Sequence, residues 1–141
     1  MDLNGHRPFY LFMHIHKTAG TTLRYIIDQQ FGPKNVLTYY NQPSTQLLDN
    51  LEAYLIVKPN YQAIIGHFGF GLHKKIGFPS VYITFLRHPV ARTVSHYKES
   101  LVNHPERLRK KNGSIRTLTE SVSANPEEYQ DYQANFLVSR N

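Results

Sequence analysis

The sequence contains no cysteine, and this absence removes several kinds of site. Disulfide scaffolds, thiolate zinc sites and cysteine nucleophiles are excluded, while the redox compartment is left open. Long apolar runs are also missing, since the run from Phe9 to Met13 falls far short of the roughly 18 residues that a membrane helix needs. The chain does not begin with a charged segment followed by an apolar one, which is the pattern of a signal peptide. A cytoplasmic protein without an integral membrane segment is therefore the default expectation.

Acidic residues are scarce: 10 aspartates and glutamates stand against 16 lysines and arginines, which gives a formal net charge of +6. Such a charge favours an anionic partner, whether nucleotide, acidic glycan, nucleic acid or membrane surface, without choosing among them. The 141 residues fit a single domain, residues 1–141. With 40% apolar and 13% aromatic residues, the composition predicts a folded, aromatic-rich core rather than a disordered chain.

Apolar strand patterns and amphipathic helix patterns alternate along the chain. Strands are expected at 9–15, 35–40, 61–66 and 81–86. Helices are expected after Thr21 and Thr22, after a cap at Ser44, from Arg87–Pro89 to residue 103, from a capping box at Thr117–Glu120 to Asn125–Pro126, and over 127–138, with a turn at Asn112–Gly113. Apart from His14, the first strand is apolar, which is typical of a strand buried on both faces. The alternation predicts an α/β fold with a central parallel sheet.

The stretch HIHKTAGTTL, residues 14–23, places a lysine in a small-residue turn between a strand and a helix. Backbone amides and hydroxyls at a helix N-terminus bind anions, so a phosphate group is the expected ligand of this turn. The turn is not a Walker A loop, because Leu11 and His16 stand where that pattern needs glycines before Lys17. An ordinary capped turn without a ligand is the alternative interpretation.

The stretch TFLRHPVARTVSHY, residues 84–97, puts Arg87 at the end of an apolar strand and Ser95 eight residues later on the following helix. A guanidinium group binds a terminal phosphate through two parallel hydrogen bonds, and a hydroxyl adds another donor. In nucleotide hydrolases the corresponding strand ends in an acidic residue that holds magnesium, whereas this strand ends in Arg87. The pattern therefore argues against a site for ATP with Mg²⁺. Arg92 is a weaker candidate for the same phosphate. A surface ion pair is the alternative for Arg87.

Between these stretches, His67 follows a strand and a glycine within IIGHFGFGLHKKIG, residues 64–77. The unperturbed pKa of histidine, near 6.5, suits a group that takes the proton of an attacking hydroxyl. A hydrogen-bonded structural histidine is the alternative. His14 and His16 alternate at the end of the first strand, but no H-E-x-x-H motif or comparable spacing accompanies them, so no metal is expected.

The stretches HIHKTAGTTL and LRHPVARTVSHY together resemble the two nucleotide-binding segments of sulfotransferases that use 3′-phosphoadenosine 5′-phosphosulfate (PAPS). The resemblance is strongest to the branch that contains the heparan sulfate 2-O- and 6-O-sulfotransferases and their bacterial relatives. It implies a P-loop-type three-layer fold and transfer of a sulfuryl group from PAPS to a hydroxyl, here of a saccharide. Neither a metal nor a nucleic acid takes part in the implied reaction.

The same resemblance implies a role for each motif. The 5′-phosphosulfate would be held by Lys17, Thr18, Ala19, Gly20, Thr21 and Thr22, and the 3′-phosphate by Arg87 and Ser95. Lys17 would also stabilise charge on the leaving oxygen, and His67 would be the catalytic base. Related domains continue past an Asn-containing helix that the stretch YQANFLVSRN, residues 132–141, resembles. We therefore expect the domain to be incomplete at its C-terminus and to expose apolar surface.

Two other functions are compatible with the same residues. A truncated or non-catalytic relative would keep the nucleotide site without turnover, and a small-molecule kinase would use ATP with Mg²⁺. The basic run RLRKKNGSIR, residues 107–116, is either a solvated turn or a tether for an acidic acceptor. Neither the acceptor nor the oligomeric state follows from the sequence.

Overall fold

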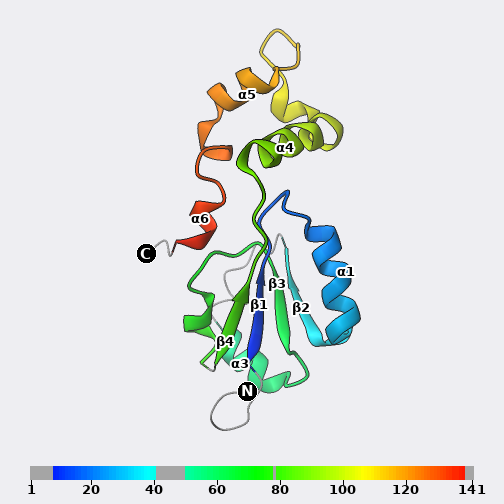
Figure 1. Cartoon of the computed structure of the whole chain (residues 1–141), viewed down its shortest axis with the longest axis vertical. Helices are drawn as coiled ribbons and strands as arrows, with labels where there is room; N and C mark the ends of the chain where they lie inside the picture. Colours follow the sequence, from blue (N-terminus) through cyan, green and yellow to red (C-terminus); the bar gives the residue numbers. More distant parts are fainter. Residues whose placement is uncertain (1–7, 41–49, 78, 139–141) are drawn as a thin grey trace.

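The computed structural model describes residues 8–40, 50–77 and 79–138 and contains a four-stranded sheet (Figure 1). Its strands are β1 (Phe9–Met13), β2 (Val36–Tyr39), β3 (Ala63–Gly66) and β4 (Ser80–Ile83), in the order β2-β3-β1-β4. All neighbouring strands are parallel. The predicted α/β fold with a central parallel sheet is confirmed, although each strand is shorter than the apolar run that predicted it.

Helices follow the strands in the expected alternation. In the described part of the chain they are α1 (Gly20–Phe31), α3 (Leu51–Val57), α4 (Pro89–Asn103), α5 (Leu118–Ala124) and α6 (Ala134–Leu137), with 3₁₀ turns at Pro33–Asn35, Leu72–Lys75, Pro105–Leu108 and Pro126–Glu128. The predicted cap at Ser44 lies outside the described residues. Among the described helices, none combines the length and the apolarity that crossing a bilayer requires.

Two buried clusters give the molecule its three layers, because successive side chains of a strand point to opposite faces of the sheet. On one face, Phe12 of β1 packs in a cluster with Leu23 of α1. On the other face, Leu11 packs in a cluster with Leu55 of α3. Burial on both faces explains why β1 reads as a nearly continuous apolar run.

Beyond β4 the chain leaves the sheet. Figure 1 shows α4 and α5 standing beyond the carboxyl ends of the strands, and α6 returning beside the sheet. The turn predicted at Asn112–Gly113 is present, with Gly113 at φ 86° and a bridge between Arg109 and Ile115. The capping box at Thr117 and Glu120 is also confirmed.

The prediction of one continuous helix over 127–138 is wrong. A 3₁₀ turn covers Pro126–Glu128, Asp131 adopts a left-handed backbone conformation with φ 50°, and only Ala134–Leu137 is α-helical. The left-handed backbone at Asp131 interrupts a right-handed helix. After this break, Tyr132 packs on the guanidinium of Arg92, whereas Phe136 packs against the core of the sheet.

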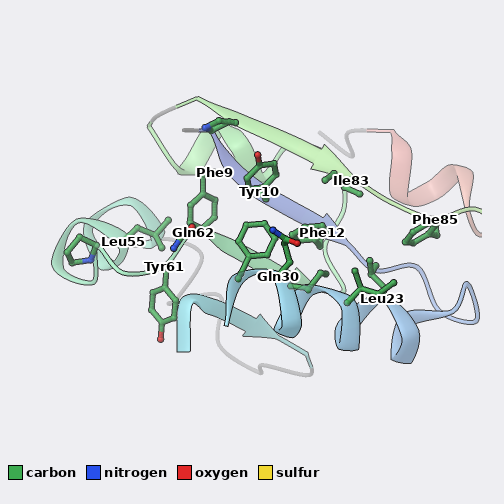
Figure 2. A pocket seen from close by; sticks show the side chains of 15 residues that line it. Phe9, Tyr10, Phe12, Leu23, Gln30, Leu55, Tyr61, Gln62, Ile83 and Phe85 are labelled. Atoms are coloured by element: carbon green, nitrogen blue, oxygen red, sulfur yellow. The ribbon is translucent and has the colours of Figure 1, made fainter. Parts of the chain in front are cut away.

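An apolar groove with a volume of about 1030 Å³ lies on the face of the sheet that α1 covers. Figure 2 shows Tyr10, Phe12 and Ile83 from the sheet, Phe85 just after β4 and Leu23 from α1 around it. The groove remains open because α4, the helix that follows β4, extends away from the sheet (Figure 1). We call this feature the sheet groove.

Candidate active site

The three predicted motifs lie at one edge of the sheet. The turn with Lys17 follows β1, His67 follows β3, and Arg87 comes shortly after β4. Because these neighbouring strands are parallel, their carboxyl ends lie side by side. Open α/β sheets bind their ligands in the crevice at this end of the strands.

The turn between β1 and α1 is held in an uncommon backbone conformation. Lys17 and Ala19 have φ values of 68° and 69°, which side chains other than glycine adopt at a cost of order 1–3 kcal/mol each. The buried hydroxyl of Thr18 donates to the carbonyl of Ile15 at 2.7 Å, which ties the turn together. Its proton is thereby used inside the protein and is not available to a ligand.

The first turn of α1 has the features of an anion site. No side chain caps the helix at Ala19, and no acidic residue lies in its first turn. The backbone N–H groups of Gly20, Thr21 and Thr22 have no partner within the helix, because the first turn of an α-helix lacks preceding carbonyls. These groups and the helix dipole favour a negatively charged ligand at this position.

Gly20 allows the ring of His14 to pack against the start of α1. A Cβ atom at position 20 would lie 1.7 Å from Nε2 of His14, a separation that no side chain tolerates. The other ring nitrogen, Nδ1 of His14, lies 3.1 Å from the hydroxyl of Tyr40, which follows β2. His14 therefore fills the space beneath the turn between β1 and α1.

Arg87 contacts the same turn across a wide sequence separation. Its Nη1 donates to the carbonyl of Lys17 at 3.2 Å, which brings the two predicted phosphate-binding motifs together. The backbone of Arg87 is fixed by the side chain of Gln133, whose Oε1 accepts the Arg87 N–H at 2.9 Å and whose Nε2 donates to the Arg87 carbonyl at 2.8 Å. Sequence analysis did not single out Gln133 individually.

The other two candidates on α4 have different surroundings. Ser95 is half-buried, and its hydroxyl makes no hydrogen bond to any described residue. Arg92 is almost fully buried, with its guanidinium carbon 4.1 Å from the ring centre of Tyr132 and its Nη2 donating to the carbonyl of Glu128 at 3.2 Å. Arg92 thus joins α4 to the returning C-terminal segment, whereas Ser95 keeps a free hydroxyl.

The hydrogen bond of His67 defines its tautomer. Nδ1 lies 2.8 Å from the carbonyl oxygen of His14, and because a carbonyl only accepts, Nδ1 carries the proton. In the neutral ring, Nε2 then has a free lone pair, and no described residue bonds to it. Burial lowers the pKa of His67, and the hydrogen bond to His14 opposes this shift. The ring is therefore neutral at neutral pH and is able to accept a proton at Nε2.

A second cavity, of about 680 Å³, adjoins His67. It is lined by His67, Gly69, Phe70, Glu127, Tyr132, Asn135, Phe136 and Val138. The cavity combines aromatic rings with an amide and a carboxylate, and we call it the acceptor cavity after the use that we propose for it. The loop after β3 and the C-terminal segment are held together here by the Phe70 N–H, which donates to the Phe136 carbonyl at 2.8 Å.

His16 is a member of the site that sequence analysis considered only as a metal ligand. Its ring stacks on the ring of His67 with centroids 3.5 Å apart and an angle of 18° between planes. Its Nδ1 lies 2.7 Å from the hydroxyl of Tyr132, a residue 116 positions away. No group of histidine, aspartate and glutamate side chains in the described residues is arranged to hold a metal ion.

Burial changes the protonation of this histidine group. Desolvation lowers the pKa of His14 and of His16 to about 4 each, and the neighbouring imidazole of His67 adds to the shift. Both rings are therefore neutral at pH 7. The site presents Lys17 and Arg87 as its cations, with neutral imidazoles beside them.

Comparison with known proteins identifies the family. Residues 6–136 match the profile of the sulfotransferase family. No curated protein and no solved structure gives a significant match. Since the family match covers nearly the whole chain, including the Lys17 turn, His67 and Arg87, the protein belongs to the sulfotransferase family.

Proposed function

We propose that the protein is a PAPS-dependent O-sulfotransferase. The observation that carries the proposal is that the Lys17 turn, Arg87 and His67 lie together at the carboxyl ends of neighbouring parallel strands. The tautomer of His67 also leaves its Nε2 free to accept a proton. The backbone N–H groups at the start of α1 would bind the 5′-phosphosulfate, and Lys17 would lie beside it. Arg87 and the free hydroxyl of Ser95 would bind the 3′-phosphate.

The proposed transfer is a single in-line displacement. Nε2 of His67 takes the proton of the acceptor hydroxyl while its oxygen forms a bond to sulfur. The bond between sulfur and the bridging phosphate oxygen breaks, and its electron pair passes to that oxygen. Lys17 stabilises the resulting negative charge. The products are the sulfated acceptor, adenosine 3′,5′-bisphosphate and a protonated His67, which returns its proton to water.

We infer that the acceptor is a saccharide, as in the heparan sulfate branch. The lining of the acceptor cavity supports this choice, because Phe70 and Phe136 offer apolar rings to the C–H face of a sugar. Asn135 and Glu127 offer hydrogen bonds to its hydroxyls. A saccharide has both kinds of surface.

Calorimetric titration with adenosine 3′,5′-bisphosphate, with and without Mg²⁺, tests the donor site. We expect binding that is independent of Mg²⁺ and is weakened in Arg87→Ala and Ser95→Ala. Adenosine 5′-phosphosulfate, which lacks the 3′-phosphate, should lose little affinity in either variant. Arg109→Ala is the matched control, because Arg109 donates to Gly113 in its own turn, away from the sheet edge.

Three results would contradict the proposal in different ways. Binding of ATP that requires Mg²⁺ would favour a small-molecule kinase. Binding of the bisphosphate without transfer from PAPS to chemically desulfated heparin or to simple saccharides would favour a non-catalytic relative. Equal weakening of both nucleotides in Arg87→Ala would give Arg87 a structural role.

Lys17→Ala should reduce turnover by about 10²- to 10³-fold, the usual effect of removing one donor that stabilises developing charge. The affinity for adenosine 3′,5′-bisphosphate should change much less, because the lysine acts mainly when the leaving oxygen becomes anionic. Steady-state kinetics and calorimetry on Lys17→Ala and on the exposed control Lys34→Ala separate these effects. An unchanged turnover in Lys17→Ala would remove the lysine from the mechanism.

A further inference from the structure

The ring of His67 is held on several sides. Its Nδ1 is bonded to the His14 carbonyl, and one face stacks on His16 at 3.5 Å. The ring of Tyr40 meets it edge-on, with centroids 4.7 Å apart and an angle of 70°. Of these contacts, the stack with His16 is the closest between rings and covers one face of the imidazole.

His16 is itself fixed by Tyr132. The Tyr132 hydroxyl lies 2.7 Å from Nδ1 of His16. A phenolic O–H is the stronger donor of the pair because it is the more acidic, so Tyr132 donates and His16 carries its proton on Nε2. Burial raises the pKa of Tyr132, which keeps this hydroxyl protonated.

Tyr132 has an anchor of its own on α4. The buried guanidinium of Arg92 lies 4.1 Å from the centre of its ring, a cation–π distance. A continuous series of contacts therefore runs from α4, which also carries Ser95, through Arg92, Tyr132 and His16 to His67. This series links the helix of the predicted 3′-phosphate site to the predicted base.

From this arrangement we propose that His16, oriented by Tyr132, is a positioning residue for His67. The proposal rests on the function proposed above and extends it to residues outside the phosphate-binding motifs. His16 acts through the stacked ring: it keeps water from one face of His67 and holds Nε2 toward the acceptor cavity. It takes no proton from the acceptor and makes no contact with the transferred group.

Removing His16 should therefore change the titration of His67. The ionisable side chains that face His67 from the surrounding elements are His14, His16, Tyr40, Glu127 and Tyr132. Lys17 acts on the adjoining ring of His14. In His16→Ala, water replaces the stacked ring and relieves the desolvation of His67. The midpoint of the His67 titration should rise toward the unperturbed value near 6.5.

The primary test is a proton–nitrogen NMR titration of the histidine rings in the full chain. His16→Phe retains a flat ring and should leave the His67 midpoint close to that of the wild type. Tyr132→Phe loosens His16 and should give a smaller upward shift than His16→Ala. The double variant His16→Ala/Tyr132→Phe should not exceed His16→Ala, because both changes act through one contact. His104→Ala, at a side chain 43% exposed on the far end of α4, is the control.

Activity provides a second readout. With PAPS and desulfated heparin, His16→Ala should lower kcat by about tenfold or more while the Kd of adenosine 3′,5′-bisphosphate stays within about twofold. The acid limb of the rate profile should move upward with the NMR midpoint, since the base acts in its neutral form. His16→Phe should recover most of the rate.

The outcomes separate this proposal from the proposed function. An unchanged His67 midpoint in folded His16→Ala would overturn the positioning role, whether or not the protein transfers sulfate. Weaker nucleotide binding with an unchanged midpoint would also overturn it, since His16 would then serve the phosphate turn. A shifted midpoint in a protein that never transfers sulfate would support the positioning of His67 and overturn the proposed function alone. If His16→Ala does not fold, the comparison of Tyr132→Phe with wild type decides in the same way.

Discussion

At the scale of single residues, a carbonyl oxygen determines the chemistry available to His67. Because the His14 carbonyl accepts from Nδ1, the ring presents an unprotonated Nε2 rather than an N–H. The residue that supplies this carbonyl also packs its ring against Gly20 and places Nδ1 near Tyr40. One segment, residues 14–20, thus shapes both the turn before α1 and the surroundings of His67.

His67→Ala should abolish transfer and leave the affinity for adenosine 3′,5′-bisphosphate nearly intact, because a base acts on the acceptor and not on the nucleotide. Transfer assays and calorimetry on the same preparation measure the two effects. His104→Ala is the control, since the His104 side chain is 43% exposed at the end of α4 and lies outside the acceptor cavity. Full activity in His67→Ala would show that another group removes the proton.

Acid should destabilise the protein through His14 and His16. Their pKa values are about 4 in the folded chain and near 6.5 when unfolded, so the unfolded state binds more protons between these values. Stability therefore rises with pH across this window and falls as pH drops through it. Each histidine contributes at most about 1.4 kcal/mol per pH unit, and solvent screening of the half-buried rings reduces this limit.

Thermal unfolding between pH 4 and pH 7.5 tests this effect. His16→Phe removes one of the two titrating groups, so its Tm should depend less steeply on pH than the wild-type Tm. His104→Phe, which changes an exposed histidine, should keep the wild-type slope. Parallel slopes for wild type and His16→Phe would show that His16 does not resist protonation in the folded state.

At the scale of elements, the strands were predictable because each is an apolar run with a clear end. The positions of Lys17, His67 and Arg87 at strand ends followed from the same reasoning, since parallel strands bring their carboxyl ends together. The predicted roles of these residues remain predictions, because the fold supplies position and not reactivity.

The C-terminal segment was not predictable in the same way. Its pattern resembles a helix, yet contacts from Tyr132 to Arg92 and from Gln133 to Arg87 hold it in a bent path. Contacts between residues that are 40 or more positions apart leave no periodic signal in either partner. The pairing of His16 with Tyr132 has the same character, and only the folded chain reveals it.

Thr117→Ala should loosen α5 by about 1 kcal/mol, the usual cost of losing an N-terminal cap. The Thr117 hydroxyl accepts from the Glu120 N–H, and the Glu120 carboxylate accepts from the Thr117 N–H at 2.8 Å. Hydrogen exchange of the α5 amides should accelerate in this variant. Thr119→Ala, an exposed change within the same helix, should leave the exchange rates close to wild type. Equal rates in both variants would mean that packing, and not the cap, holds α5.

At the scale of the whole molecule, the C-terminal segment is a second link between the sheet and the helices α4 and α5, beside the chain that runs from β4 to α4 (Figure 1). The helices α4 and α5 stand beyond the sheet, and the chain returns to bond Arg87 through Gln133 and the loop after β3 through Phe136. These contacts close one side of the candidate active site. On the face of the sheet that carries α1, the sheet groove stays open between that helix and the strands (Figure 2).

The open sheet groove should make the protein self-associate as its concentration rises. Ile26 and Phe85, which line the groove, are 53% and 46% exposed, and burying apolar surface of this kind yields about 25 cal/mol per Å². The net charge of +6 opposes association, so added salt should strengthen association by screening that repulsion.

Sedimentation velocity over a range of protein and salt concentrations measures this self-association. The double variant Ile26→Gln/Phe85→Ser should shift association to higher concentrations, whereas Val102→Gln, at a side chain 78% exposed on α4 and outside the groove, should not. A monomeric wild type at every concentration and salt level would show that the groove exposes too little apolar surface to drive association.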